Sequence, residues 1–443
     1  YGQVTLDKIT TLNPGLKKET AHLIANGAGR VKRPFQVCNM GMFVKTPGTE
    51  YQYLVPVQAT PFFTGIVSEP PGVTDFNGRA PGGGGVTSFG FNSDLDKVEG
   101  NDVRVMQDRQ WALVDIVGTS SAAFAETLQN LGKKYLDDPL ALLQKVDGKG
   151  KHSLLCLEKV KPFIKKKKPG IFENVLGKID ELDIVKDLKG GLDQIEKLFE
   201  AEGGKFKDEV ETALKDIVSF MNPLYKYWPV KDISPAPEVV PTNFADGGSL
   251  ENMGVNAMLT YSDINRLIAF INCETPMTAG EYGVYDVDGT PVENTKIQLD
   301  SQVPPLFGYQ PYNDDNSKGT GGYRTYKDKN GNLIDRQFSN SQVFPCDAFP
   351  ALLKGLWEAN GSGHKTGGAN YKQTLTTMDN QWFGVAGGRQ VTMLWVYNNY
   401  IGDWAGKLSG DVQEILKGVE NFPNYSTMNT ELTPTEVNLL SNM

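Results

Sequence analysis

Apolar stretches of strand length recur along the chain, separated by turn residues. Four of them are rich in β-branched and aromatic side chains, which favour strands: Phe35–Val44, Trp111–Val117, Arg266–Cys273 and Gln390–Tyr397. The last two are almost continuously apolar, which indicates buried strands. A short helical pattern, Met253–Leu259, precedes the third stretch. The pattern therefore predicts a globular core that contains both strands and helices.

The composition changes over residues 145–232. This segment holds eighteen lysines, no arginine and sixteen acidic residues, which gives a net charge of +2. The whole chain carries −9, so the remainder carries −11. Apolar residues recur at helical spacing over Phe172–Leu188 and Phe206–Met221. We predict a lysine-rich helical insertion or lid here, which divides the core into a first part, 1–144, and an aspartate-bearing second part, 233–443.

The segment Phe244–Val255 contains the strongest candidate for a catalytic residue. In it Asp246 is followed by Gly247 and Gly248, which let the backbone turn sharply and approach a ligand closely. A carboxylate on such a turn can orient or deprotonate a nucleophile. The same tripeptide also fits a plain turn between two elements, since aspartate and glycine are common turn residues.

A second candidate is Ser120. The predicted strand Trp111–Val117 leads through Gly118 to this serine. A helical pattern, Ala125–Leu131, follows, and together these features have the layout of a nucleophile elbow. Ala122 stands where such an elbow normally has its second glycine. The Ser120 hydroxyl therefore also fits a simpler role, as the N-terminal cap of the helix.

The histidines and cysteines limit the kinds of catalytic and metal site that the sequence can form. The three histidines are scattered, so they offer little to a Ser-His-Asp triad or to a zinc site: His22, His152 and His364. The four cysteines match no metal-binding motif and fit either two disulfides or free thiols: Cys38, Cys156, Cys273 and Cys346. We therefore expect no metal ion and no cofactor.

The net charge and hydropathy of the chain limit the partners that it can bind. A net charge of −9 argues against bulk nucleic-acid binding, which needs a basic face. No apolar run is long enough to cross a bilayer, so we expect no transmembrane segment. The run Lys165, Lys166, Lys167 and Lys168 could rest on an anionic lipid surface as a peripheral membrane contact, or it could form a solvated loop.

Little in the sequence indicates the compartment. The chain begins with Tyr1 rather than Met and shows no signal peptide, so we expect a processed or partial product. Two glycosylation sequons begin at Asn360 and Asn424. Such triplets also arise by chance, so a secreted or lumenal location and a cytosolic one with peripheral membrane contact both stay open.

Several segments, taken in order, resemble the group IV cytosolic phospholipase and fungal lysophospholipase family. They are Gly118–Phe124, Met221–Tyr227, Asp246–Gly248 with Asn252, Phe344–Ala348, and Asn424–Thr427 followed by Glu436–Asn438. The aspartate, its two glycines and the asparagine are similar to a family signature that is likewise followed by a helix and an apolar strand. The resemblance extends from about Phe35 to the C-terminus and leaves out most of the lysine-rich insertion.

The resemblance implies a Ser-Asp dyad on a patatin-like lipase fold. In that family a serine on a glycine-rich elbow attacks the acyl ester, the aspartate takes its proton, and backbone amides bind the oxyanion. Asp246 matches the aspartate, and Gly247 and Gly248 match the active-site loop. The family's serine elbow lies upstream of every matched segment, so it would precede Tyr1.

Three readings follow from this resemblance. In the first, a companion N-terminal fragment supplies the serine to this chain. In the second, the active centre is degenerate and the protein binds lipid or serves structurally. In the third, Ser120 is the nucleophile and Asp246 is its partner, because Gly118–Ser120 also resembles the patatin elbow.

We therefore predict an α/β fold of the patatin-like lipase type, with a central, largely parallel sheet and a helical insertion. The predicted function is hydrolysis of acyl esters in phospholipids or lysophospholipids. Asp246 is the predicted base, and Ser120 is an alternative nucleophile. The alternative function is that of a catalytically inactive lipid-binding or structural relative of the same fold.

Overall fold

The structure is a computed structural model that describes residues 35–46, 52–100, 102–107, 109, 111–122, 223–231, 239–334, 338–362, 368–399, 401–420, 422–425 and 432–443. The chain forms two compact units, one of residues 1–120, 226–242 and 247–443 and one of residues 121–225 and 243–246. Most of the predicted insertion, with Cys156 and Lys165–Lys168, lies outside the described residues.

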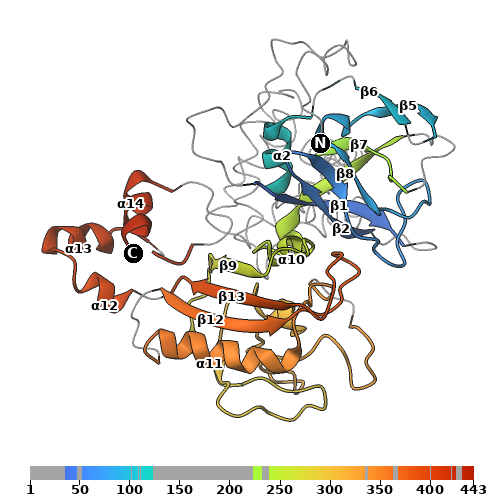
Figure 1. Ribbon diagram of the computed structural model, residues 1–443. Coiled ribbons are helices and arrows are strands. Elements are labelled where there is room, and N and C mark those ends of the chain that lie inside the picture. Colours follow the sequence, from blue (N-terminus) through green and yellow to red (C-terminus); the bar gives the residue numbers. More distant parts are fainter. Residues whose placement is uncertain are drawn as a thin grey trace, which may run out of the picture. The chain divides into compact units, whose positions relative to one another are not determined.

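Among the described residues, one sheet contains six strands in the order β4-β3-β2-β1-β8-β7. Its strands are β1 (Cys38–Lys45), β2 (Gln52–Ala59), β3 (Phe63–Ile66), β4 (Gly84–Thr87), β7 (Leu224–Tyr227) and β8 (Val240–Asp246). A separate hairpin consists of β5 (Asp94–Glu99) and β6 (Asp102–Met106). Figure 1 shows these strands in blue to green.

The middle of this sheet is held by the antiparallel pair β1 and β2. The two strands pair along their whole length, from Cys38 opposite Ala59 to Lys45 opposite Gln52. A tight turn then leads from β2 into β3, because the Thr60 side chain accepts the amide N–H of both Phe62 and Phe63. Such a turn reverses the chain, so β3 also runs antiparallel to β2.

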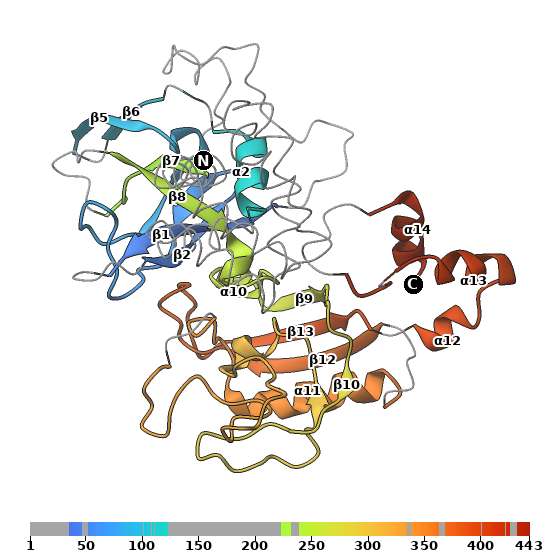
Figure 2. The same ribbon diagram turned by 180° about the vertical axis from the view of Figure 1, so that it is seen from behind.

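A second sheet contains three strands in the order β12-β13-β9: β9 (Arg266–Ile271), β12 (Ala369–Thr376) and β13 (Gln390–Tyr397). Helix α11 (Phe349–Ala359) packs on β12, and both views show it running along this sheet (Figure 1; Figure 2). Gly355 makes the close approach possible, since a Cβ atom there would overlap the ring of Tyr371. Buried aromatic rings fill the core beside the helix: Phe307, Phe344, Phe349 and Trp395.

The remaining elements of the described residues are short. The helices are α2 (Leu113–Ser120), α10 (Val255–Leu259), α12 (Gly402–Ala405), α13 (Gly410–Lys417) and α14 (Pro434–Asn442). The 3-10 turns are η2 (Ser88–Gly90), η4 (Gly247–Ser249), η5 (Pro304–Phe307) and η6 (Cys346–Ala348), and β10 (Thr278–Ala279) pairs with β11 (Ile297–Gln298).

The predicted fold, a patatin-like lipase fold with a central, largely parallel sheet, is wrong. The pairs β1–β2, β2–β3, β3–β4, β5–β6, β10–β11 and β12–β13 are all antiparallel, while β9 and β13 are parallel. For β2 and β3 the length of the connection is the reason. Only Thr60–Phe62 joins β2 to β3, whereas a parallel crossover needs roughly a dozen residues or more.

The predicted positions of three strands and one helix are confirmed. β1, β9 and β13 lie within the predicted stretches to within a residue or two, and α10 lies within the predicted helical pattern. The expected burial of β9 is wrong, however. β9 is an edge strand of its sheet, and Phe270 on its outer face is 71% exposed.

Three features bear on the environment of the chain. Within the described ranges, no helix combines the length and the apolar character that crossing a bilayer requires. The sequon residue Asn360 is fully buried, and the Asn424 side-chain amide donates to the carbonyl oxygens of Cys273 and Asn398. The asparagine of one sequon is therefore buried, and that of the other is hydrogen-bonded within the fold.

Replacing Gly355 with alanine should lower the free energy of unfolding by about 1–3 kcal/mol, because the new methyl group would overlap the Tyr371 ring. Gly118→Ala in α2 is the matched control. A Cβ atom there meets nothing within 4 Å, so the substitution should raise the free energy of unfolding by about 0.5–1 kcal/mol. Chemical denaturation measures both values, and an equally stable Gly355→Ala variant would contradict the close packing of α11 on β12.

Candidate functional site

Asp246 is the last residue of β8 and stands directly before the turn η4. Its side chain is half-buried. The carbonyl oxygen of Gly247 accepts the amide N–H groups of Leu250 and Glu251 at 2.9 and 3.0 Å. The carboxylate therefore lies on a tight, hydrogen-bonded turn, as the sequence predicts, and this turn follows a strand, β8.

The first glycine of the motif is required by packing. A Cβ atom on Gly247 would lie 2.6 Å from the carbonyl carbon of Asn39 and 2.7 Å from its Cβ atom. We expected these glycines to allow close approach to a ligand, whereas the close approach of Gly247 is to the backbone of β1. Gly254, at the other end of the loop, is required by conformation, because its φ of 72° is one that other residues rarely adopt.

A buried carboxyl group, that of Glu251, holds the loop between these glycines. Its side-chain oxygens accept the backbone N–H of Met253 at 2.6 Å and of Asn256 at 3.0 Å. Burial raises the pKa of this carboxyl group, and the hydrogen bonds from the backbone amides of residues 253–256 oppose the rise. Because Gly254 has no side chain to cap α10, Glu251 does the work of an N-terminal cap.

A guanidinium group holds the other end of α10. Arg389 donates to the carbonyl oxygen of Leu259 and, at 3.2 Å each, to those of Tyr261, Ser262 and Ile264. These carbonyl groups lie where the helix ends, so a cation there also meets the negative end of the helix. The segment that follows Asp246 is thus fixed by one acidic and one basic side chain.

Neither Glu251 nor Arg389 stands out in the sequence as a candidate site residue. Glu251 could have been recognised as an acidic residue that closely precedes a predicted helix, where a negative charge is favourable. Arg389 lies 130 residues after Leu259, and no local pattern connects the two. Asn252, which belongs to the family resemblance, is exposed and donates to Gln302 at 2.8 Å.

The predicted strand before Ser120 is wrong. Residues Leu113–Ser120 form helix α2, so Ser120 is the last residue of a helix and not the apex of a strand-to-helix elbow. The Asp115 carboxylate explains the difference. It accepts the backbone N–H of Ala112 at 3.0 Å, as an acidic residue at the third position of a helix commonly does.

The described part of the second unit includes the end of β8. There the backbone N–H of Asp246 points to the carbonyl oxygen of Ala122 at 3.4 Å, and the N–H of Phe244 donates to Pro223 at 2.8 Å. Ala122 comes two residues after Ser120 in the sequence. The structure therefore brings the segment that follows α2 beside the backbone of Asp246.

The free thiols are poor nucleophiles. Cys38, Cys273 and Cys346 form no disulfide. Burial raises the pKa of all three thiols, that of Cys273 to about 12. A thiol attacks as its thiolate, so these cysteines are badly placed for covalent catalysis. Among the described residues, no three histidine, cysteine or acidic side chains gather as metal ligands would.

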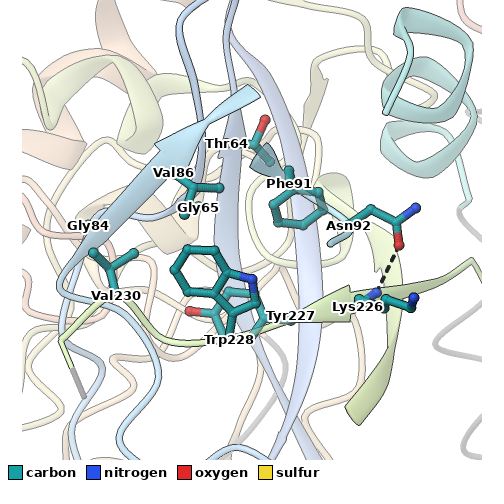
Figure 3. Close-up of a pocket in the computed structure, with 10 residues that line it drawn as sticks. All are labelled: Thr64, Gly65, Gly84, Val86, Phe91, Asn92, Lys226, Tyr227, Trp228 and Val230. Atoms are coloured by element: carbon teal, nitrogen blue, oxygen red, sulfur yellow. Dashed lines mark hydrogen bonds between the residues drawn. The ribbon is translucent and has the colours of Figure 1, made fainter. Parts of the chain in front are cut away.

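A small cavity lies between β3, β4 and β7 (Figure 3). Thr64, Phe91, Tyr227 and Trp228 line it, and the Lys226 backbone N–H donates to Asn92 at its rim. Its volume of about 10 Å³ holds about one water molecule, so it has no room for an acyl chain.

No family model, no curated protein and no solved structure matches this chain.

Gly247→Ala should lower the free energy of unfolding by about 1–3 kcal/mol, because its methyl group would press on the Asn39 backbone. Gly410→Ala is the control. It adds a methyl group where nothing lies within 4 Å, so the change should stay within about 0.5 kcal/mol. Urea denaturation of the two variants is the test, and equal stability would show that η4 does not rest on β1.

Proposed function

We propose that this chain bears the general base of a carboxylic-ester hydrolase that acts on phospholipids or lysophospholipids. In this proposal Asp246 takes the proton from a serine that a companion fragment carries, and the serine oxygen attacks the acyl carbonyl carbon. The single observation that carries the proposal is the placement of Asp246 at the end of β8, on a turn fixed by buried hydrogen bonds.

Geometry of this kind suits a base. A general base must hold its carboxylate steady while a proton moves over a few tenths of an ångström, and a rigid turn supplies that steadiness. The half-buried position of Asp246 also limits the water around it. The proposal depends on this local turn and on the motif resemblance, and it takes no support from the sheet topology that we expected.

The second candidate is a lipid-binding or structural protein without activity. It is favoured by α2, whose apolar side chains face outward although a soluble helix normally buries them. Val114 is 75% exposed, and Leu113 and Val117 are about half exposed. The two candidate functions make different predictions: the first requires ester hydrolysis that depends on the Asp246 carboxylate, and the second requires no hydrolysis.

Asp246→Asn should lower kcat for a phospholipid or lysophospholipid ester by about 10²–10⁴-fold, because an amide cannot accept the proton. The free energy of unfolding should change by no more than about 0.5 kcal/mol, since the substitution keeps the side-chain shape. Asp263→Asn, at an exposed aspartate, is the control and should retain full activity. A stable Asp246→Asn variant with full activity would exclude Asp246 from the chemistry.

A fluorophosphonate probe identifies the nucleophile in the active protein. We expect the label on a serine of a companion polypeptide, and Ser120→Ala should leave the labelling unchanged. A label on Ser120, located by mass spectrometry and lost in that variant, would instead support Ser120 as the nucleophile and contradict the companion fragment. Ester hydrolysis with no labelled serine at all would contradict serine chemistry.

A further inference from the structure

The loop between Asp246 and α10 contains a group of buried polar side chains that the proposed proton transfer does not use. Glu251 is 7% exposed, Asn256 is fully buried and Ser341 is 2% exposed. Buried polar groups are costly unless they are hydrogen-bonded, so such a group marks a place where a particular backbone geometry is maintained.

The hydrogen bonds form a continuous connection from the turn to the helix. The Glu251 backbone N–H donates to Gly247, and its side chain accepts from the backbone of Met253 and Asn256. The Asn256 side-chain amide donates to the Ser341 carbonyl oxygen at 3.0 Å. The Ser341 hydroxyl donates back to the Leu250 carbonyl oxygen at 2.8 Å, which closes the ring of contacts.

Only a carboxylate satisfies this arrangement. Both Glu251 oxygens face backbone N–H groups, so both must accept. A glutamine has one acceptor oxygen, and its amide nitrogen would meet a backbone N–H donor with no acceptor between them. An aspartate keeps both acceptors but is one methylene shorter, so it can satisfy the donors only in part.

The neighbouring elements hold the same helix from two further sides. Gln58 on β2 donates to the Ala257 carbonyl oxygen at 3.3 Å and accepts from the Tyr261 hydroxyl at 2.9 Å. Arg389 donates to the carbonyl oxygen of Leu259 and to carbonyl groups beyond it. With α10 anchored in this way, the Glu251 side chain connects residue 251 to the start of a fixed helix, and the backbone N–H of the same residue donates to Gly247 in the turn.

We propose that Glu251 is a positioning residue, whose carboxyl group fixes the turn η4 and with it the Asp246 carboxylate at the end of β8. The role in turnover rests on the proposed function of Asp246, whereas the role in ordering the turn does not. Glu251 touches no reacting atom in this account. It acts through the backbone of Gly247–Leu250.

The test compares Glu251→Gln and Glu251→Asp with a matched control, Glu293→Gln, at an exposed glutamate. Amide hydrogen exchange of the full-length chain is followed by mass spectrometry over residues 247–258 and, as an internal reference, over β12 and β13. Unsatisfied buried donors should accelerate exchange over 247–258 by about tenfold or more in Glu251→Gln. Glu251→Asp should show a smaller acceleration, and the reference strands and Glu293→Gln should match the wild type.

Ester hydrolysis by the same variants tests the consequence for Asp246. Glu251→Gln should lower kcat about tenfold or more with KM within about twofold, because a misplaced base slows the proton transfer without weakening substrate binding. Glu251→Asp should restore part of kcat.

The outcomes separate the two proposals. Unchanged exchange over residues 247–258 in Glu251→Gln would overturn the role of Glu251 in holding the turn, whatever the activity. Faster exchange with unchanged kcat would overturn its positioning role in catalysis. Full activity in Asp246→Asn, or no hydrolysis by the wild type, would overturn the proposed function, while the exchange data would still decide whether Glu251 orders the turn.

Discussion

The hydrogen bonds that the buried Glu251 carboxyl group accepts from the backbone after it are the constraint on which the candidate site depends. They fix a loop whose other contacts are set by shape, since Gly247 fits against Asn39 only without a side chain. Arg389 adds the opposite charge at the far end of α10. A short helix that would be unstable alone is thereby held at both ends. Asp246 lies directly before the ordered turn that leads to this helix.

One short connection sets strand direction in the six-stranded sheet. The turn Thr60–Phe62 leaves the chain no length for a crossover, so β3 runs antiparallel to β2. In the second sheet α11 covers one face through the close contact of Gly355 with Tyr371. The architecture therefore differs from a parallel α/β core.

Local features were predictable from the sequence, and long-range ones were not. The Asp-Gly-Gly turn and the strand β13 follow from residue types within a few positions of each other. Strand direction could not be read from apolar runs, because both kinds of sheet contain them. The predicted strand at Trp111–Val117 is wrong for a related reason. The β-branched residues of this stretch are typical of a strand, whereas the Asp115 carboxylate stabilises the start of a helix. The contact of Arg389 with α10 has no local signature.

The central claim, that Asp246 activates a serine hydroxyl, is tested most directly by an experimental structure of the active protein. Crystals of the uninhibited protein would show which groups surround the Asp246 carboxylate. The account predicts a serine Oγ atom within about 2.6–3.2 Å of a carboxylate oxygen, the reach of a general base. A carboxylate that contacts only structural backbone groups or solvent, with every serine hydroxyl beyond that reach, would contradict it.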